Sequence, residues 1–257
     1  MKWKNPGWGL LAGMLCTHAM AVEPWAPTDA ELASLPPLCK VKMKAGAGSP
    51  EYKNWEQSLG KDWLHTHHYC AGLNFLNRYY RARSASDKGS NLKNARGNLQ
   101  YMVTHAAPTY SLMPDVYLNL GVVYSLSNQP AQAISHFNKA IELNPRQPRA
   151  YNAMTDYYSS IKQTAKALET VSEGLRHNPD TRSLQRRYTE LGGKLPYPAP
   201  IEPEQVAAPA TPPTEKTATP VVQAPVEQAV TTPATEPVSS PPGNGSPKNP
   251  YCRFCPD

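Results

Sequence analysis

The sequence predicts an all-α fold: a short helical solenoid of about three helix pairs and a capping helix, followed by a disordered, Pro-rich C-terminal tail. Three observations support this fold class. Residues 114–147 and 148–181 are consecutive 34-residue blocks with the same residue pattern. Within each block, apolar and small residues recur at the i, i+3, i+4 and i+7 spacing of one helix face. The tail stands apart because 15 of the 28 prolines lie between residues 196 and 250.

Residues 1–21 have the pattern of a secretory signal peptide. Lys2 and Lys4 precede a short apolar run over residues 7–20, and Ala19-Met20-Ala21 provides a small-residue cleavage site. We expect cleavage after Ala21, which would place the mature protein in the periplasm or outside the cell.

Two other interpretations of the N-terminus are less favourable. A lipid anchor at Cys16 is the alternative to cleavage after Ala21, but Leu15 before it is larger than lipoprotein processing prefers. The apolar run is too short to span a bilayer, and no later stretch is long and apolar enough. We therefore expect no stable membrane insertion once the signal peptide is removed.

The charge distribution argues against a nucleic-acid partner. The formal net charge of +6 falls to +4 when residues 1–21 and their two lysines are removed. The basic residues alternate with acids and form no continuous stripe. Arg182, Arg186 and Arg187 are the exception, and we expect them to lie on a solvated helix face.

Residues 22–61 are predicted to form an N-terminal arm that wraps the first helices. Pro and Gly punctuate residues 22–50, and we expect the chain to become helical from about Pro50. Residues 62–108 then form a degenerate first repeat, with one helix over residues 63–83 and its partner over residues 91–105. The polar insertion Ser84–Ser90 is expected to form a lengthened loop with helix extensions.

Residues 114–147 and 148–181 are each predicted to form a pair of helices. Asn128-Gln129-Pro130 interrupts the helical pattern inside the first pair, and Asn144-Pro145 ends it. Gly121 and Ala133 are small enough for the two helices to cross closely. Neither helix can bury its apolar face alone, so neighbouring pairs must stack. The matched positions are Tyr117 and Tyr151, Leu120 and Met154, Tyr124 and Tyr158, Ala133 and Ala167, Phe137 and Val171, Ala140 and Gly174, and Pro145 and Pro179.

A 34-residue period with this arrangement resembles the tetratricopeptide repeat (TPR), here in a protein of the exported bacterial type. The resemblance also supports the degenerate first repeat, because Gly72 falls on Gly121 and Ala95 on Ala133. It implies a non-catalytic scaffold whose groove, lined by the first helices of successive repeats, takes an extended peptide or a partner helix. Carried onto this sequence, the partner-binding groove positions are Asp115, Leu118, Asn119, Val122, Leu126, Arg149, Asn152, Asp156 and Ser159.

The C-terminal third of the chain divides into three segments. Residues 182–195 are expected to form a capping helix, with Leu184, Tyr188 and Leu191 on its apolar side. Residues 196–250 cannot bury enough apolar surface to fold, so they are predicted to be a disordered linker. Residues 251–257 form a tip with the motif Cys252-x-x-Cys255, which we expect to dock a second partner.

The cysteines indicate disulfide bonds. Cleavage after residue 21 leaves Cys39, Cys70, Cys252 and Cys255, and an even number in an exported protein favours pairing. Three pairings are possible, and we favour Cys39 with Cys70 and Cys252 with Cys255. For Cys252 and Cys255, pairing or metal sharing with another chain and redox exchange remain alternatives, although no thioredoxin-like setting surrounds them.

A second candidate cluster comprises His65, His67, His68 and Cys70. With Cys39 these residues could form a metal site, but on a helix they do not converge on one point. We therefore favour polar residues of a buried helix, and we predict no metal site. The sequence contains no H-E-x-x-H, G-x-S-x-G or G-x-G-x-x-G motif, so we predict no catalytic residues and no cofactor.

The favoured function is therefore a non-catalytic protein-protein interaction scaffold, an adaptor in a complex of the cell envelope. The solenoid would bind one protein partner and the tail tip another. One alternative is a redox or metal-handling protein that uses Cys252 and Cys255. Another is a polymer-associated structural protein whose Pro-rich segment spans a distance.

Overall fold

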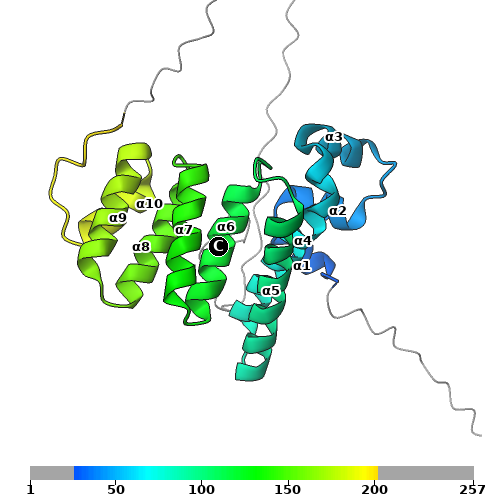
Figure 1. The fold of residues 1–257 in the computed structure, drawn as a ribbon, viewed down its shortest axis with the longest axis horizontal. Coiled ribbons are helices and arrows are strands. Elements are labelled where there is room, and N and C mark those ends of the chain that lie inside the picture. Colours follow the sequence, from blue (N-terminus) through cyan, green and yellow to red (C-terminus); the bar gives the residue numbers. More distant parts are fainter. Residues whose placement is uncertain (1–25, 202–257) are drawn as a thin grey trace, which may run out of the picture.

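A computed structural model describes residues 26–201, and helices are the only regular secondary structure in this part of the chain (Figure 1). The expected signal peptide, most of the Pro-rich tail and the Cys252-x-x-Cys255 tip lie outside the described residues. The helices are α1 (Asp29–Ala33), α2 (Pro37–Lys44), α3 (Pro50–Leu59), the 3-10 helix η1 (Lys61–His65), α4 (Thr66–Arg81), α5 (Ala85–His105), α6 (Met113–Leu126), α7 (Pro130–Leu143), α8 (Pro148–Ser160), α9 (Thr164–His177) and α10 (Arg182–Glu190).

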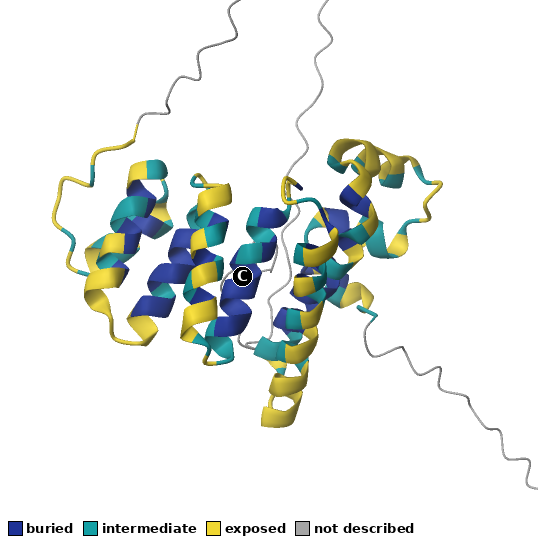
Figure 2. Cartoon of the chain, viewed as in Figure 1, coloured by how far each residue is buried: buried dark blue, intermediate teal, exposed yellow. Residues whose placement is uncertain are grey.

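Three helix pairs form the body of the molecule. The pairs α4–α5, α6–α7 and α8–α9 pack helix against helix and lie in a row, with α1–α3 at one end and α10 at the other (Figure 1). The buried residues lie mainly where neighbouring helices meet, and the exposed residues lie on the outer surfaces of the helices (Figure 2). The predicted all-α solenoid of stacked pairs is therefore confirmed.

The same local signals shape both full repeats. Pro114 and Pro148 occupy the same position of the two repeats and stand in the first turn of α6 and α8, where the missing backbone N–H needs no partner. Asn128 and Lys162 occupy the same position of the two repeats, and both have a left-handed backbone, with φ of 55° and 60°. The N–H of the next residue, Gln129 or Gln163, then donates to the carbonyl of Tyr124 or Tyr158 at 2.9 Å. This turn ends the first helix of each repeat.

The helices of the first full repeat cross closely at a glycine. A Cβ atom at Gly121 would overlap the Phe137 ring, so only glycine leaves room for that ring between α6 and α7. Phe137 is 1% exposed, and Ala133 is fully buried. Tyr124 is 7% exposed and also belongs to the core. The predicted close crossing is confirmed, and the larger residue that the glycine accommodates is Phe137.

The arm is more helical than its Pro- and Gly-rich composition indicated. Helices α1 and α2 both begin before Pro50, and they bury Leu32 and Leu38 in the core. Thr28 accepts a hydrogen bond from the backbone N–H of Glu31, whose side chain in turn accepts one from the Thr28 N–H, which forms a capping box for α1. The prediction that helix starts only at about Pro50 was therefore wrong, because a good cap and a Pro-initiated turn suffice for short helices.

The arm is fixed to α4 by a disulfide bond. Cys39 in α2 and Cys70 in α4 are joined, with their Cα atoms 5.4 Å apart, and both residues are fully buried. The predicted pairing of these two cysteines is confirmed. The bond closes a loop across 31 residues of sequence and holds the arm against the first helix pair.

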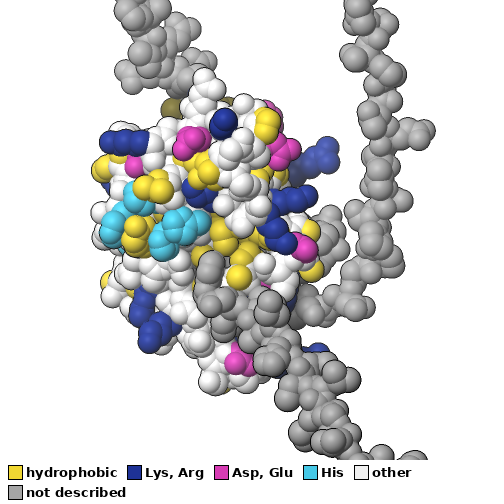
Figure 3. Space-filling view, turned by 90° about the vertical axis from the view of Figure 1, so that its right-hand side faces the viewer, with side chains coloured by type: hydrophobic (Ala, Val, Ile, Leu, Met, Phe, Trp, Pro, Cys, Tyr) yellow, Lys and Arg dark blue, Asp and Glu magenta, His cyan; other side chains and the backbone are white. Residues whose placement is uncertain are grey.

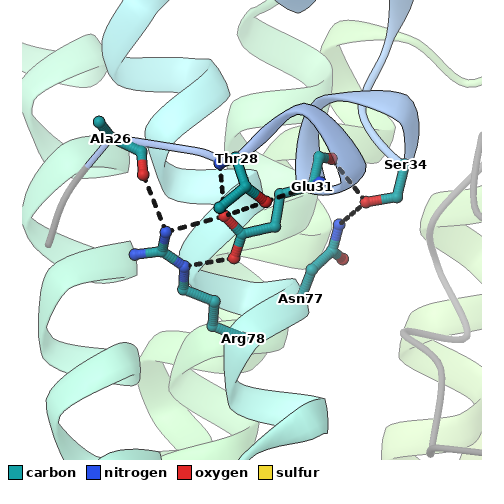
Figure 4. A network of polar contacts seen from close by, with 6 residues as sticks. All are labelled: Ala26, Thr28, Glu31, Ser34, Asn77 and Arg78. Carbon is teal, nitrogen blue, oxygen red and sulfur yellow. Dashed lines mark hydrogen bonds and ion pairs between the residues drawn. The ribbon is translucent and has the colours of Figure 1, made fainter. Parts of the chain in front are cut away.

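A polar network also joins the arm to α4 (Figure 4). Arg78 donates from Nε to Glu31 Oε1 at 2.6 Å and from Nη2 to Glu31 Oε2 at 2.9 Å and to the Ala26 carbonyl at 3.0 Å. Burial raises the pKa of Glu31, but the bonds from Arg78 and Thr28 outweigh it and lower the pKa to about 2. The Glu31 carboxylate therefore stays charged over a wide pH range.

The insertion in the degenerate first repeat is helical. Helix α5 begins at Ala85, directly after Ser84, whose side chain accepts a hydrogen bond from the Asp87 N–H at 2.9 Å. The residues expected in a lengthened loop therefore extend α5 toward its N-terminus, and the connection to α4 is short. Of the lengthened loop with helix extensions expected at Ser84–Ser90, the helix extension is confirmed and the lengthened loop was wrong, because the Ser84 cap starts the helix earlier than the apolar pattern does.

The solenoid ends at α10 and at a short segment after it. Leu184 is fully buried, while Tyr188 and Leu191 are half-buried beside it, as expected for a capping helix. The chain then stays on the solenoid: the rings of Tyr197 and Tyr188 lie 5.8 Å apart, and the Ile201 N–H donates to the Arg176 carbonyl at 2.8 Å. The prediction that a non-packing tail begins at Pro196 was therefore wrong, because residues 196–201 contact α9 and α10. None of the helices in residues 26–201 is long and apolar enough to cross a membrane.

Candidate functional site

The first helices of the three pairs border a hollow of about 530 Å³, here called the groove hollow. Helix α4 contributes one residue, α6 contributes three, α8 contributes four and α7 contributes one. These residues are Tyr80, Val122, Ser125, Leu126, Ala153, Asp156, Tyr157, Ser160 and Phe137. The hollow therefore lies where the resemblance places the partner-binding groove.

The groove hollow combines an apolar floor with a polar rim. Phe137 and Tyr157 are 1% and 7% exposed, and their ring centroids are 6.2 Å apart. Leu126 is half-buried, and Ser160 is exposed at the end of α8. An apolar side chain of a partner can be buried on this floor, while the rim offers hydrogen-bonding groups.

Four of the predicted groove residues connect neighbouring helices. Asp115 Oδ1 accepts hydrogen bonds from Arg149 Nη1 at 2.9 Å and from Gln147 Nε2 at 2.7 Å, which joins α6 to the start of α8. Asp156 receives two bonds of 2.7 Å from the guanidinium of Arg187, which joins α8 to α10. These ion pairs hold the first helices of successive pairs in register. Asn152 Nδ2 adds a bond of 2.8 Å to Ser183 Oγ.

The Asp156–Arg187 ion pair corrects the expectation for the arginine-rich face of α10. Arg187 was expected to be solvated, but its side chain is only 19% exposed because it lies against Asp156. Arg182 and Arg186 are exposed, as expected. The face is therefore divided between solvent and the neighbouring helix.

The predicted groove positions differ in their access to a partner. Val122, Leu126 and Asp156 line the groove hollow, and Ser159 is exposed beside it. Leu118 is fully buried in the core, and Asn119 is 1% exposed and donates to the Asp115 carbonyl. Leu118 and Asn119 therefore do not present a surface to a partner, because α6 turns them toward its neighbours.

Sequence reasoning missed six residues of the groove hollow. The repeat alignment could have found Ser125 and Ser160, since these are the counterparts of Ser159 and Leu126 at the 34-residue spacing. Tyr80 could not be found in this way, because its counterpart is Gln129, which lies beyond the end of α6. The other three residues, Phe137, Ala153 and Tyr157, were not among the predicted groove positions.

The histidine cluster is at the surface, where histidine side chains gather on one face (Figure 3). The Tyr101 ring of α5 lies between His68, at 3.7 Å, and His105, at 3.8 Å between ring centroids. His65 lies 5.7 Å from Tyr101, and the rings of His67 and His68 are 4.2 Å apart. Helix α4 is largely buried and Cys70 is disulfide-bonded, as expected. The histidine rings themselves are not buried, since His67 is exposed and His65 and His68 are half-buried.

One histidine and the cysteine of this cluster have altered chemistry. Burial and the neighbouring charge of His68 lower the pKa of His67. Cys70 is in the disulfide bond and has no free thiolate. Within residues 26–201, no group of three or more His, Cys, Asp or Glu side chains is arranged to hold a metal ion. Cys252 and Cys255 lie outside the described residues, so the role of that motif stays a prediction.

Comparison with known proteins identifies one repeat. Residues 114–147 match the family model described as the tetratricopeptide repeat. No curated protein and no solved structure matches the chain. The matched residues form α6, the turn at Asn128 and α7, and the next 34 residues form α8 and α9 in the same arrangement. The chain therefore carries a tetratricopeptide repeat at residues 114–147 within an all-helical solenoid of stacked pairs.

Proposed function

We propose that the protein is a non-catalytic interaction scaffold that holds a segment of a partner protein in the groove hollow. The groove hollow itself is the observation that carries this proposal. It lies across α4, α6 and α8, and it offers a buried apolar floor at Phe137 and Tyr157. A peptide or helix that inserts an apolar side chain there would bury it against aromatic rings, with Ser125 and Ser160 near its backbone.

The ion pairs beside the groove support a preformed site. Arg149–Asp115 and Arg187–Asp156 link α6, α8 and α10 before any partner arrives. A partner that binds a preformed groove loses less free energy to ordering than one that must fold the site. Substituting Arg149 or Asp156 would therefore disturb the position of whole helices, and these residues are poor choices for testing direct contact.

The proposal places this scaffold in the cell envelope, where the tail tip would bind a second partner. The signal-peptide pattern of residues 1–21 supports export. The Cys39–Cys70 disulfide supports it too, because disulfides persist in oxidising compartments. Tyr251 and Phe254 are the aromatic residues of the tip and supply apolar groups for docking.

Charge placed in the groove tests this function. In the full-length protein, Leu126→Arg and Ser160→Arg should prevent capture of the groove partner from cell envelopes, because a guanidinium would occupy the apolar hollow. Gln132→Arg, at an exposed position of α7, is the matched control and should leave capture unchanged. Circular dichroism would establish that all three variants fold.

The tail is tested in the same experiment. Deletion of residues 202–257 should remove a different partner and leave the groove partner bound. Capture that survives both groove substitutions would rule out the groove hollow as the binding site. Loss of a single common partner in the groove and tail variants would contradict a scaffold with two separate contacts.

A further inference from the structure

A second hollow, here called the side hollow, has a volume of about 380 Å³ and lies between α7 and α9 over α8. It shares no lining residue with the groove hollow, because its walls are the second helices of the two full repeats. Tyr151, Tyr158, Thr170, Asn138, Glu169 and Glu173 supply its polar groups and aromatic rings. It is therefore a separate feature of the surface.

Tyr151 lines the side hollow and has a buried, unpaired hydroxyl. The residue is only 1% exposed, and its OH group has no hydrogen-bond partner in the described part of the chain. Burial raises the pKa of this phenol, and the nearby Glu173 raises it further. The hydroxyl therefore stays protonated and can both accept and donate a hydrogen bond. Buried polar groups in native proteins nearly always have partners, so an orphan hydroxyl beside a cavity points to a ligand.

Negative charge surrounds the same cavity. Within residues 26–201, the Glu169 carboxylate has no hydrogen bond or ion pair. Glu173 lines the hollow as well and interacts with His177 at 3.1 Å and Arg176 at 3.3 Å. Lys166 contributes one positive charge, with its Nζ 5.7 Å from the centroid of the Tyr158 ring. The lining thus carries two carboxylates against one ammonium group.

Comparison of the two repeats explains why the hollow is open. Thr170 occupies the position of His136, whose ring lies 5.0 Å from Tyr124 and 5.8 Å from Tyr117. In the first repeat the imidazole therefore lies against the two tyrosines that correspond to Tyr158 and Tyr151. The small Thr170 side chain leaves this space empty in the second repeat.

A second difference between the repeats also leaves the side hollow open. Gln100 Nε2 donates to the Tyr124 hydroxyl at 2.6 Å, from the helix that precedes the first full repeat. When Ala95 is aligned with Ala133, the counterpart of Gln100 is Asn138, which is one methylene shorter. Asn138 lines the side hollow and makes no hydrogen bond to Tyr158 or to any other described residue.

From these contacts we infer that the side hollow binds an arginine side chain of a partner protein. The apolar stem of the arginine would lie against Met154. Its guanidinium would displace the exposed Lys166 ammonium from the Tyr158 ring and stack there. Its N–H groups would donate to the Glu169 carboxylate and to the Tyr151 hydroxyl. A guanidinium suits this cavity better than an ammonium ion, because its planar set of donors reaches several acceptors and an aromatic face at once.

Nuclear magnetic resonance titration of the full-length protein tests this inference, with N-acetyl-arginine methylamide as the probe. We expect saturable shifts confined to amides of residues 138–173. The neutral citrulline analogue has nearly the same shape and should bind at least about tenfold more weakly, because it lacks the charge that Glu169 pairs with. Equal binding of the two probes, or no saturable binding of the arginine probe, would overturn the inference.

Substitutions in the side hollow show whether the arginine probe binds there. Thr170→His introduces the side chain found at the same position of the first repeat, and it should abolish the shifts while preserving the fold. Tyr151→Phe should weaken probe binding about tenfold without lowering the midpoint of unfolding, since the lost hydroxyl has no partner in the protein. Tyr117→Phe is the matched control in the first repeat and should leave binding unchanged. Glu169→Gln, at an exposed position, should weaken binding as Tyr151→Phe does.

The variants also distinguish this site from the groove. Retention of binding by Thr170→His, or equal loss in Tyr117→Phe and Tyr151→Phe, would contradict the assignment to the side hollow. Leu126→Arg in the groove hollow should leave the arginine probe bound. The side hollow can therefore fail this test while the groove keeps its partner, and the reverse also holds.

Discussion

The two full repeats share one backbone arrangement and differ in how they fill it. In the first repeat Gly121 makes room for the large Phe137, and both are buried in the core region. In the second repeat the same positions hold Thr155 and Val171, which are 1% and 0% exposed. Compared with the first repeat, the second repeat therefore has a larger residue on its first helix and a smaller residue on its second helix. Volume is conserved across the helix crossing while the individual residues change.

On the outer side of the repeats, the smaller side chains of the second repeat are not balanced by larger ones. His136 and Gln100 contact the tyrosines of the first repeat, whereas Thr170 and Asn138 leave the side hollow open in the second. A core position must be filled, because a void there costs stability. A position at the surface can stay open, and that freedom is what allows one repeat of a pair to acquire a binding site.

The pair α4–α5 is stabilised by contacts from outside its own sequence. A disulfide and the Glu31–Arg78 ion pair attach the arm to α4. The two full repeats have no disulfide bond and depend on packing and on the ion pairs that join α6 to α8 and α8 to α10. Substitutions should therefore destabilise the two regions in different ways. The pair α4–α5 should be sensitive to loss of the disulfide or of the ion pair to the arm, and the two full repeats should be sensitive to loss of packing.

The largest effect should come from the packing of the first repeat. Phe137→Ala should lower the free energy of unfolding by about 3–5 kcal/mol, because it empties the space beside Gly121. Val171→Ala, at the matched position, should cost only about 2 kcal/mol, since it removes fewer buried carbons. Urea unfolding measures both losses. A loss below about 1 kcal/mol for Phe137→Ala, or equal losses, would contradict the exchange of volume between repeats.

The disulfide should contribute nearly as much, but in the other region. Cys39→Ala with Cys70→Ala removes a link across 31 residues of sequence. The chain-entropy model gives a loss of about 3–4 kcal/mol for a loop of this length. Hydrogen exchange should show the loss first in α1, α2 and α4, with α8 and α9 still protected. Uniform loss of protection along the chain would show that the two regions are not stabilised separately.

The Glu31–Arg78 ion pair should make the arm sensitive to acid. The folded pKa of Glu31, about 2, lies below its ordinary value of 4.5, so its contribution is fully present above pH 4.5 and is lost as the pH falls toward 2. The contribution should be about 2–3 kcal/mol. Glu31→Gln should lower stability at neutral pH and reduce its slope between these pH values. If the melting temperature of Glu31→Gln falls between pH 4.5 and 2 as steeply as that of the unsubstituted protein, Glu31 does not cause the acid sensitivity of the arm.

Features of the fold that depend on spacing along the chain could be predicted from the sequence, whereas features that depend on docking between segments could not. The pattern of Gly121, Ala133 and Phe137 predicted α6 and α7 and their crossing, because spacing along a helix determines which side chains face each other. The pairing of Cys39 with Cys70 was predicted because both lie within one segment of the chain, and it is confirmed. The helices α1 and α2 were missed, since short helices depend on caps and on docking to α4 more than on periodicity.

The candidate site was predicted less well than the fold. A spacing rule selects positions on a helix, but it does not tell which of them neighbouring helices cover. Leu118 was assigned to the groove and is buried, while Tyr80 lines the groove hollow from a helix that is longer than the repeat pattern. Asp156 was expected to face a partner and contacts Arg187 from α10. These contacts depend on how helices stack, which the repeat pattern alone does not specify.

The smallest effect should come from the tail. Deletion of residues 202–257 should leave the melting temperature nearly unchanged, because residues 196–201 keep their contacts with α9 and α10. Deletion of residues 194–257 should cost about 1 kcal/mol, since it removes the contact of Tyr197 with Tyr188. Differential scanning calorimetry measures both. If deletion of residues 202–257 lowers the melting temperature as much as deletion of residues 194–257, residues after 201 also stabilise the solenoid.

Site-specific photo-crosslinking in cell envelopes tests the central claim, that the groove hollow holds a partner protein. The photoreactive residue p-benzoylphenylalanine would replace Ser125 or Ser160 in the groove, and Gln132 or Ser135 on the exposed side of α7. We expect one crosslinked protein of the same mass from both groove positions and none from the two α7 positions. Equal crosslinking from all four positions, or crosslinks from α7 alone, would contradict it.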